Sequence, residues 1–440
     1  MFKLSIKKIL TIYFLLIATF ILGGCSLLGY NIPFLSKEKS ANQDNKKKEK
    51  VTLVYWSLFE DYSIIEPLLK EYQQQNPHIK IIYEQKDFDN LNAYKDSLLS
   101  KLIKGEKTPD ILRIHQTWIP FFVSYLAPAP KSTLDILEFQ KDFYPSAQKS
   151  LIYNNKIYAM PLMFDSLALF YNKDLFDFAK VSPPSTWSDF SSLANSLTKR
   201  SNNTIKVSGA AFGNASNVAH FSDIISLMIQ QSKLTLPEDF TSPAMKDIIK
   251  FYTSFVKTNP VWSDKMAYSP LAFAQGNVAM MFGTSWRLAD ILKENPSLNV
   301  GVVPVPQAVD NNSLTKNNVT SFWVEGVNKS SSNYDEAWKL LVWLSKKEQL
   351  TKRFTNASET RPFGELYPRI SMQKNLSENP YLSAFYANAE NAMPSIFSDA
   401  SGNDAYVNIF KNIIEGYIKG ISLDELLKIA QKEYVRLQNN

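Results

Sequence analysis

The strongest constraint on the fold is a strand–helix–strand pattern near the start of the body of the chain. Residues 51–56 (VTLVYW) and 79–83 (IKIIY) are β-branched and aromatic runs typical of strands. Between them, apolar residues recur at the spacing of one helix face: Ile65, Leu68, Leu69 and Tyr72. We expect Pro67 in the first turn of this helix and Asn76-Pro77 at its end. Such a βαβ unit predicts a parallel sheet.

The same alternation continues along the chain. A helical stripe from Leu91 to Leu102 precedes Gly105, which suits a helix C-terminus, and residues 110–114 (DILRI) predict the next strand. Residues 158–171 predict one or two more strands. Residues 186–189 (TWSD) match a capping box that starts a helix.

Later segments are again helical, at 337–344 and 423–437. The chain has 440 residues, which is too long for one typical core and suits two lobes. We therefore predict an α/β protein of two lobes, each built on a parallel-rich sheet flanked by helices.

The excess of positive over negative charge is confined to the beginning of the chain. The formal net charge is +6. Three lysines without acids give residues 1–25 half of that excess, and six lysines against three acids give residues 26–50 the other half. The body from Val51 onward is therefore balanced, and it offers no basic footprint for nucleic acid.

The first residues are typical of a secretory signal. Basic residues 1–8 precede an apolar run at 9–22, which is short for a membrane span, and Gly23-Gly24-Cys25 follows. The segment that ends at Cys25 resembles the bacterial lipobox. The resemblance implies a signal peptide at 1–24 and a lipid on Cys25, the one cysteine of the chain. An uncleaved N-terminal anchor is the alternative.

Residues 25–50 are then expected to be a lipidated cysteine and a disordered tether, because they hold polar residues and a lysine run but few core formers. The lysines either stay solvated or contact anionic headgroups.

The sequence offers little for catalysis or for metal binding. The three histidines, His78, His115 and His220, are widely spaced, and neither a phosphate-binding loop nor a nucleophile elbow is present. We therefore expect no metal, no cofactor and no enzymatic activity. A glycosidase-type lipoprotein stays open, since such an enzyme needs only two carboxylates at the right separation.

Aromatic and polar residues gather where strands are expected to end, which is where open α/β sheets bind ligands. Aromatic rings together with acids and amides suit a sugar. The candidates are Trp56, Glu60 and Asp61 after the first strand, His115, Gln116 and Trp118 after the third, and Trp286 later in the chain. For each Trp taken alone, core packing is the alternative.

Several segments in one order resemble the family 1 extracellular solute-binding proteins, the sugar-binding relatives of maltose-binding protein. They are residues 108–111 (TPDI), 126–128 (LAP), 156–161 (KIYAMP), 169–176 (LFYNKDLF), 184–187 (PSTW), 273–280 (FAQGNVAM), Ala337-Trp338 and Arg361-Pro362. The likeness covers nearly the whole mature chain.

The resemblance implies two lobes with a ligand cleft between them and crossings near residues 164–168 and 318–323. The first lobe would comprise residues 51–165 and 319–372. The second would comprise residues 166–318 and the C-terminal helices at 373–440. The resemblance also implies an extracytoplasmic monomer that serves the membrane subunits of an ABC importer.

Carried over by position, Asp165 falls at a ligand-binding acid, Trp286 at a stacking aromatic, and Trp118 and His115 on the first-lobe wall. Arg361 is also a ligand-binding candidate, because the Arg361-Pro362 segment resembles the family. Two positions depart from the family.

Ser321-Phe322-Trp323 stands where relatives often have a glycine pair, so Trp323 either reaches the cleft or packs at the hinge. The spacing after Met393-Pro394 is unusual and leaves Tyr406 as a candidate. The same architecture binding a polyamine, a phosphodiester or a peptide is the alternative function.

Overall fold

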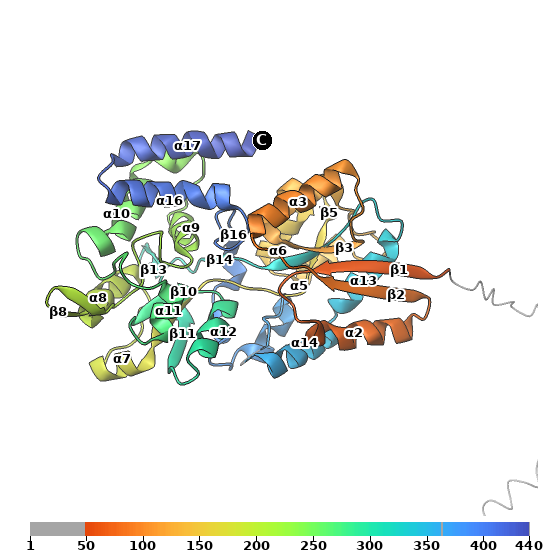
Figure 1. The fold of residues 1–440 in the computed structure, drawn as a ribbon, viewed down its shortest axis with the longest axis horizontal. Helices are drawn as coiled ribbons and strands as arrows, with labels where there is room; N and C mark the ends of the chain where they lie inside the picture. The colour runs from red at the N-terminus through yellow and green to blue at the C-terminus, as the bar shows by residue number, and fades with distance from the viewer. Residues whose placement is uncertain (1–48, 362–363, 440) are drawn as a thin grey trace, which may run out of the picture. The chain divides into compact units, whose positions relative to one another are not determined.

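The computed structural model describes residues 49–361 and 364–439 (Figure 1). The predicted signal peptide, the lipidation of Cys25 and nearly all of the predicted tether lie outside these residues. In the part of the chain that is described, no helix has the length and apolar character needed to cross a bilayer.

The first sheet has five strands in the order β2-β1-β3-β15-β6. Its strands are β1 (Val51–Ser57), β2 (Ile79–Gln85), β3 (Ile111–His115), β6 (Ala159–Pro161) and β15 (Trp323–Val327). The βαβ prediction is confirmed, because β1 pairs in parallel with β2 and with β3. β15 is antiparallel to both of its neighbours.

Local signals set the helices beside this sheet. In α2 (Tyr62–Gln75), the Asp61 carboxylate accepts the Ser63 N–H at 2.8 Å and starts the helix. Pro67 therefore lies inside α2, and its expected place in the first turn is wrong. The reason is that this cap begins the helix upstream of the apolar stripe. α3 (Leu91–Lys104) ends at Gly105, whose φ of 65° is left-handed as expected.

The second sheet has the order β10-β7-β11, with β7 (Ala168–Asn172), β10 (Met280–Gly283) and β11 (Val300–Pro304). Both outer strands run antiparallel to β7. The expectation of a parallel-rich sheet in the second lobe is therefore wrong. An apolar run such as that of β7 marks a buried strand but does not encode the direction of its neighbours.

Longer helices pack around both sheets. They are α8 (Trp187–Leu197), α9 (Phe221–Gln231), α10 (Pro243–Lys257), α12 (Ser285–Glu294), α13 (Tyr334–Leu344), α14 (Lys347–Thr360), α16 (Asp404–Ile418) and α17 (Leu423–Asn439). The predicted capping box at Thr186 is present and starts α8. α16 packs against α17, α10 and α9 (Figure 1).

Shorter elements complete the fold. The helices are α4 (Ile119–Phe122), α5 (Ile136–Asp142), α6 (Pro145–Leu151), α7 (Lys173–Ala179), α11 (Ser269–Ala274) and α15 (Ser383–Tyr386). The strands are β4 (Ile152–Tyr153), β5 (Lys156–Ile157), β8 (Lys199–Ser201), β9 (Thr204–Val207), β12 (Val309–Asp310), β13 (Ser313–Leu314), β14 (Asn318–Thr320) and β16 (Ala392–Pro394).

Two connections lead out of the first sheet side by side. The chain passes from β6 to β7 through residues 162–167 and from β14 to β15 through residues 321–322. The Leu167 N–H donates to the Val319 carbonyl at 3.2 Å, and the Ser321 N–H donates to the Asp165 carbonyl at 3.2 Å. Few residues therefore link the first sheet to β7 of the second sheet and to β14, which pairs with β16. Two short links that lie side by side have the geometry that a hinge requires.

Candidate functional site

A cavity of about 680 Å³ lies where these connections meet. This volume is in the range of small-molecule sites. Its lining consists of Leu58, Phe59, Phe88, Leu91, Arg113, Met163, Asp165, Ser285, Trp286, Ala289, Asp290, Leu292, Lys293, Ser321, Trp323, Thr360, Arg361, Gly364, Glu365, Asp399 and Ala400. We call Phe59, Phe88, Arg113, Trp323 and Arg361 the first wall, and Asp165, Ser285, Trp286 and Asp399 the second wall.

Aromatic rings dominate the first wall. The Phe59 ring lies 5.1 Å from that of Phe88 and 5.1 Å from that of Trp323, measured between centroids. Phe59 has a φ of 61°, an uncommon backbone conformation for a bulky residue, and its side chain is 55% exposed. Backbone strain of this kind clusters at ligand-binding sites. In this conformation the apolar Phe59 ring is exposed and lines the cavity.

A buried ion-pair network stands behind these rings. Arg113 Nε donates to Glu325 Oε1 at 2.9 Å, and Arg113 also pairs with Glu60. Arg353 Nε donates to Glu60 Oε1 at 2.7 Å. Burial alone raises the pKa of Glu60, but Arg113 and Arg353 outweigh it and lower that pKa to about 2. Glu60 is therefore firmly ionised.

The network extends to the rim of the cavity. Glu365 pairs with Arg353 at 2.6 Å and with Arg361 at 3.0 Å. Together, three arginines face three glutamates, so the charges behind the first wall balance.

The second wall centres on Trp286, which is 38% exposed. The Arg287 guanidinium carbon lies 4.0 Å from the centre of one Trp286 ring, and the His220 ring lies 5.9 Å from it at an interplanar angle of 63°. Cation–π contact and the imidazole edge therefore fix the indole and leave part of it open to the cavity.

Asp165 connects the crossing segment to α12. Its Oδ2 accepts the Ser285 hydroxyl at 2.7 Å, and both of its oxygens accept the Ser285 N–H at 3.1 Å. Burial raises the pKa of Asp165 to about 7, against the lowering effect of these hydrogen bonds. The carboxyl group thus fastens the helix turn that carries Trp286.

The structure brings four of the sequence-derived candidates to the cavity, namely Asp165, Trp286, Trp323 and Arg361. Their contact with a ligand stays a prediction. For Trp323 the two alternatives are not exclusive. It lines the cavity, and its ring also packs 5.5 Å from Trp118 and 5.2 Å from His115.

Trp118 and His115 were expected on the first-lobe wall, but neither is among the described residues that line the cavity. Both are buried behind Trp323. The Trp118 indole N–H donates to the Ser401 carbonyl at 2.6 Å. The His115 ring nitrogens lie 2.8 Å from Thr117 Oγ1 and 3.1 Å from Ser321 Oγ, and burial lowers the pKa of His115 to about 3. These side chains support the wall from inside the core.

The other candidates also have partners elsewhere. Gln116 donates to the Thr320 carbonyl at 2.7 Å, Glu60 belongs to the ion-pair network, and Asp61 is exposed at the start of α2. Two aromatic candidates pack away from the described lining. They are Trp56, with Lys86 Nζ 4.1 Å from its ring, and Tyr406, whose hydroxyl donates to the Leu437 carbonyl at 3.1 Å.

Sequence reasoning missed several lining residues. Phe59 lies just after β1, between the candidates Trp56 and Glu60. The reasoning that selected those two residues could therefore have selected Phe59 as well. Asp399 lies in a loop between β16 and α16 that has no periodic pattern, and nothing in the sequence marks it. Over the residues that are described, no three His, Cys, Asp or Glu side chains are grouped so as to hold a metal ion.

A cavity of this size, lined by aromatic rings and a few polar side chains, suits the capture of a small solute, as in a solute-binding protein. The chain belongs to the bacterial extracellular solute-binding protein family, whose model matches residues 68–369. This confirms the family that the motifs predicted. Membership of that family places the protein outside the cytoplasm.

Relatives and solved structures agree with this assignment. A putative binding protein of Brucella abortus is 24% identical over 73% of this chain and 77% of its own. The multiple sugar-binding protein of Streptococcus mutans is 21% identical over 67% and 71%. The sugar-binding protein MalE of Xanthomonas citri matches in structure with a TM-score of 0.71 and 19% identity, over 88% of this chain and 98% of its own. The last likeness confirms the two-lobed fold.

Proposed function

We propose that this protein captures a sugar or oligosaccharide in the cavity and presents it to the membrane subunits of an ABC importer. The observation that carries the proposal is the presence of aromatic rings on both walls of one cavity, Phe59 and Trp323 on the first and Trp286 on the second. Sugar rings offer C–H faces to aromatic rings and hydroxyl groups to acids and arginines. Relatives with sugar-binding names support this choice.

Capture without chemistry is part of the proposal. A carrier must release its solute intact, and Asp165 already accepts hydrogen bonds from neighbouring protein groups on both of its oxygens. We expect no product from any ligand that binds.

Closure is the proposed mechanism, with lobes at 51–165 and 319–372 and at 166–318 and 373–440. The neighbouring connections at 162–167 and 321–322 would absorb the rotation, in the mode known for periplasmic binding proteins. A ligand that touches both walls favours the closed state. Small-angle scattering with saturating ligand should show a smaller radius of gyration, and an unchanged value with tight binding would contradict closure.

The anchor belongs to the same proposal. We propose that Cys25 carries a lipid and that the following residues tether a monomer to the membrane. Replacing Cys25 with Ser should release the protein from membranes or block its processing. An unmodified residue at the mature N-terminus, read by mass spectrometry, would contradict the anchor.

Thermal-shift screening tests the proposed ligand class. A ligand that binds only the folded protein stabilises it by RT ln(1 + [L]/Kd), or about 2.7 kcal/mol at 100 Kd. The panel is D-tagatose, maltose, maltotriose, mannobiose and mannotriose, with spermidine, glycerophosphocholine and a tripeptide as the other solute classes. A shift with a sugar alone supports the proposal. A shift only with another class, or with none, would overturn it.

A further inference from the structure

The loop between β16 and α16 carries one acid, Asp399, which lines the cavity on the second wall. Neighbouring contacts hold the loop. The Ser395 hydroxyl donates to Ser226 Oγ at 2.8 Å, and the Ser398 hydroxyl donates to Ser321 Oγ at 2.8 Å. The loop is thereby tied to α9 on one side and to the β14–β15 crossing on the other.

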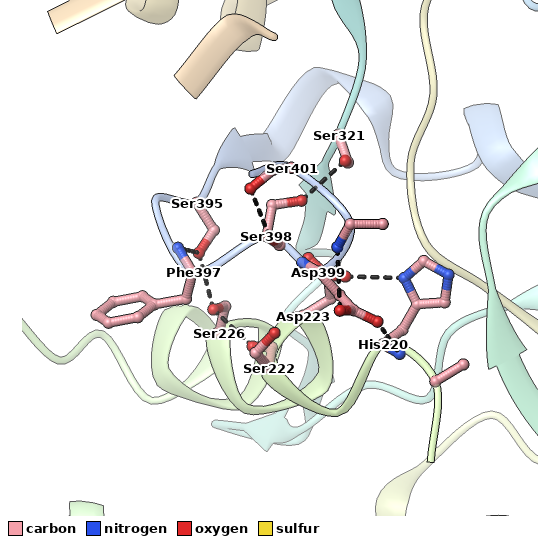
Figure 2. Close-up of polar contacts among 12 residues, drawn as sticks. His220, Ser222, Asp223, Ser226, Ser321, Ser395, Phe397, Ser398, Asp399 and Ser401 are labelled. Atoms are coloured by element: carbon pink, nitrogen blue, oxygen red, sulfur yellow. Dashed lines mark hydrogen bonds and ion pairs between the residues drawn. The ribbon is translucent and has the colours of Figure 1, made fainter. Parts of the chain in front are cut away.

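Asp399 itself is hydrogen-bonded to the residues at the beginning of α9. The His220 backbone N–H donates to Asp399 Oδ2 at 2.8 Å, and the Asp399 N–H donates to Asp223 Oδ2 at 3.2 Å. That same Asp223 oxygen lies 2.8 Å from His220 Nδ1. Figure 2 shows these reciprocal contacts, in which each of the two segments binds a carboxylate of the other.

The backbone is unusual in both of the segments that these hydrogen bonds join. His220 has a φ of 59° and Ala400 has a φ of 54°, and neither residue is a glycine. Left-handed conformations of this kind persist only where surrounding contacts enforce them. The direction of the Asp399 side chain is therefore set by the fold, although Asp399 itself is only partly buried.

Hydrogen-bond capacity distinguishes Asp399 from Asp165. A carboxylate offers about four acceptor positions. Asp165 has four contacts of 2.7–3.1 Å from Ser166 and Ser285 and is 1% exposed. Asp399 accepts one bond on each oxygen, from His220 and from the Ala400 N–H at 3.0 Å. Each oxygen of Asp399 keeps one position for a ligand.

The ion pairs around the cavity also distinguish Asp399 from acids such as Asp290. Within the described ranges, no lysine or arginine forms an ion pair with Asp399, and Arg287 pairs instead with Asp290 at 3.2 Å. Asp399 therefore lacks an ion-pair partner among the described residues, and it lies on the same wall as Trp286. A hydroxyl that donates to a charged acceptor forms one of the stronger hydrogen bonds in proteins.

We propose that Asp399, rather than Asp165, is the acid that recognises the ligand beside Trp286, by accepting hydrogen bonds from two neighbouring hydroxyl groups of a sugar. His220 and Asp223 are its positioning residues. This inference rests on the proposed sugar-binding function. It names the side chain that selects for a hydroxyl pair at that end of the cavity.

The experiment measures Kd by calorimetry for the panel sugar that gives the largest thermal shift. Asp399→Asn should raise Kd about 10-fold and Asp399→Ala about 10- to 100-fold, the scale of losing hydrogen bonds to a charged acceptor. Asp165→Asn should raise it less, because an amide oxygen at 165 still accepts from Ser285. Asp247→Asn, an exposed acid on α10 outside the described lining, is the matched control and should leave Kd unchanged.

Three results would overturn the inference. If the wild type binds a sugar and Asp399→Asn binds it within about twofold, Asp399 does not recognise the ligand and the sugar-binding function stands. A larger loss for Asp165→Asn than for Asp399→Asn would show that Asp399 is not the dominant acid beside Trp286. If the wild type binds no sugar of the panel, the proposed function fails, and this inference fails with it.

His220 needs a readout that a purely structural role would not change. Asn tolerates the left-handed backbone, so His220→Asn keeps the N–H that holds Asp399 while removing the ring that contacts Asp223. We expect a two- to tenfold rise in Kd in the wild-type background and no further rise in the Asp399→Asn background. Additive effects in this cycle would show that His220 acts independently of Asp399.

Discussion

The two walls of the cavity treat their charges in opposite ways. In and behind the first wall, Arg113 and Arg353 pair with glutamates such as Glu60, and each of these charges has a charged partner. On the second wall, Asp165 and Asp399 are held by N–H and hydroxyl groups that carry no charge. The acids of the first-wall network are therefore compensated in ion pairs, whereas Asp165 and Asp399 form no ion pair within the described residues.

This difference suggests a division of labour. A neutral network behind aromatic rings fixes shape, since Phe59 and Trp323 lie on a rigid support. Acids with neutral partners keep an electrostatic preference for donors, and so contribute selectivity more than stability. Substitutions on the first wall should mainly destabilise the fold, whereas those on the second wall should mainly change affinity.

The largest expected effect comes from breaking the first-wall network. Glu60→Gln removes a fully buried charge between Arg113 and Arg353, and we expect the free energy of unfolding to fall by about 3–5 kcal/mol in urea titrations. Glu66→Gln, which breaks an exposed 2.8 Å pair with Lys70, is the control and should cost less than about 1 kcal/mol. Equal losses would mean that burial of the network adds nothing.

The pH dependence of stability should have opposite signs at the two walls. The pKa of Asp165 is raised from 3.8 to about 7 by burial, so the folded protein holds a proton between these values that the unfolded chain has lost. Its contribution to stability falls as pH rises from about 4 to 7. The pKa of Glu60 is lowered from 4.5 to about 2 by its arginines, so its contribution falls as pH drops through that range.

Denaturation of the ligand-free protein across pH checks this contrast. Asp165→Asn should flatten the dependence between pH 4 and 7, removing on the order of 2–4 kcal/mol of variation. The same substitution should leave the acid limb below pH 4 in place, because that limb belongs to groups such as Glu60. A wild-type profile that is flat from pH 4 to 7 would refute the assignment to Asp165.

The aromatic residues of the two walls should also differ in what they contribute. Trp286→Ala on the second wall should weaken ligand binding by about 1–3 kcal/mol and leave the stability of the ligand-free protein nearly intact, because the side chain is 38% exposed. Trp323→Ala should lower both the ligand affinity and the stability of the ligand-free protein, because the Trp323 ring also packs on Trp118 and His115. Calorimetry and urea titration of both variants separate the outcomes. Equal stability losses would remove the distinction between the walls.

Much of the fold was accessible from the sequence because its signals are local. The pairing of β1 with β2, the Thr186 capping box and the end of α3 at Gly105 each depend on residues close together in the chain. Strand direction in the second sheet was not accessible. β7 pairs with β10 and β11, both more than 100 residues later, and its apolar run would look the same in either direction.

The site was predictable only in part, for the same reason. Asp165 and Trp286 follow from motif positions, whereas Trp118 was misplaced because its direction depends on a hydrogen bond to Ser401, 283 positions away. Asp399 reaches the cavity through contacts with α9 that span 176–179 positions. Side chains that long-range contacts orient leave no periodic trace in the sequence.

The smallest expected effect tests the support of the second wall. Arg287→Leu removes the guanidinium that stacks 4.0 Å from Trp286, a contact of about 0.5–1 kcal/mol at an exposed site, so Kd should rise about two- to fivefold. The intrinsic tryptophan fluorescence of the protein should shift as well, because the Trp286 indole loses a fixed neighbour. Lys86→Leu is a matched control. Its Nζ lies 4.1 Å from the Trp56 ring, outside the described cavity lining, and its loss should leave Kd unchanged. If the Arg287 variant binds as the wild type does while its fluorescence shifts, the stacked pair orients the indole without contributing to recognition. The selectivity of the second wall would then depend on its acids alone.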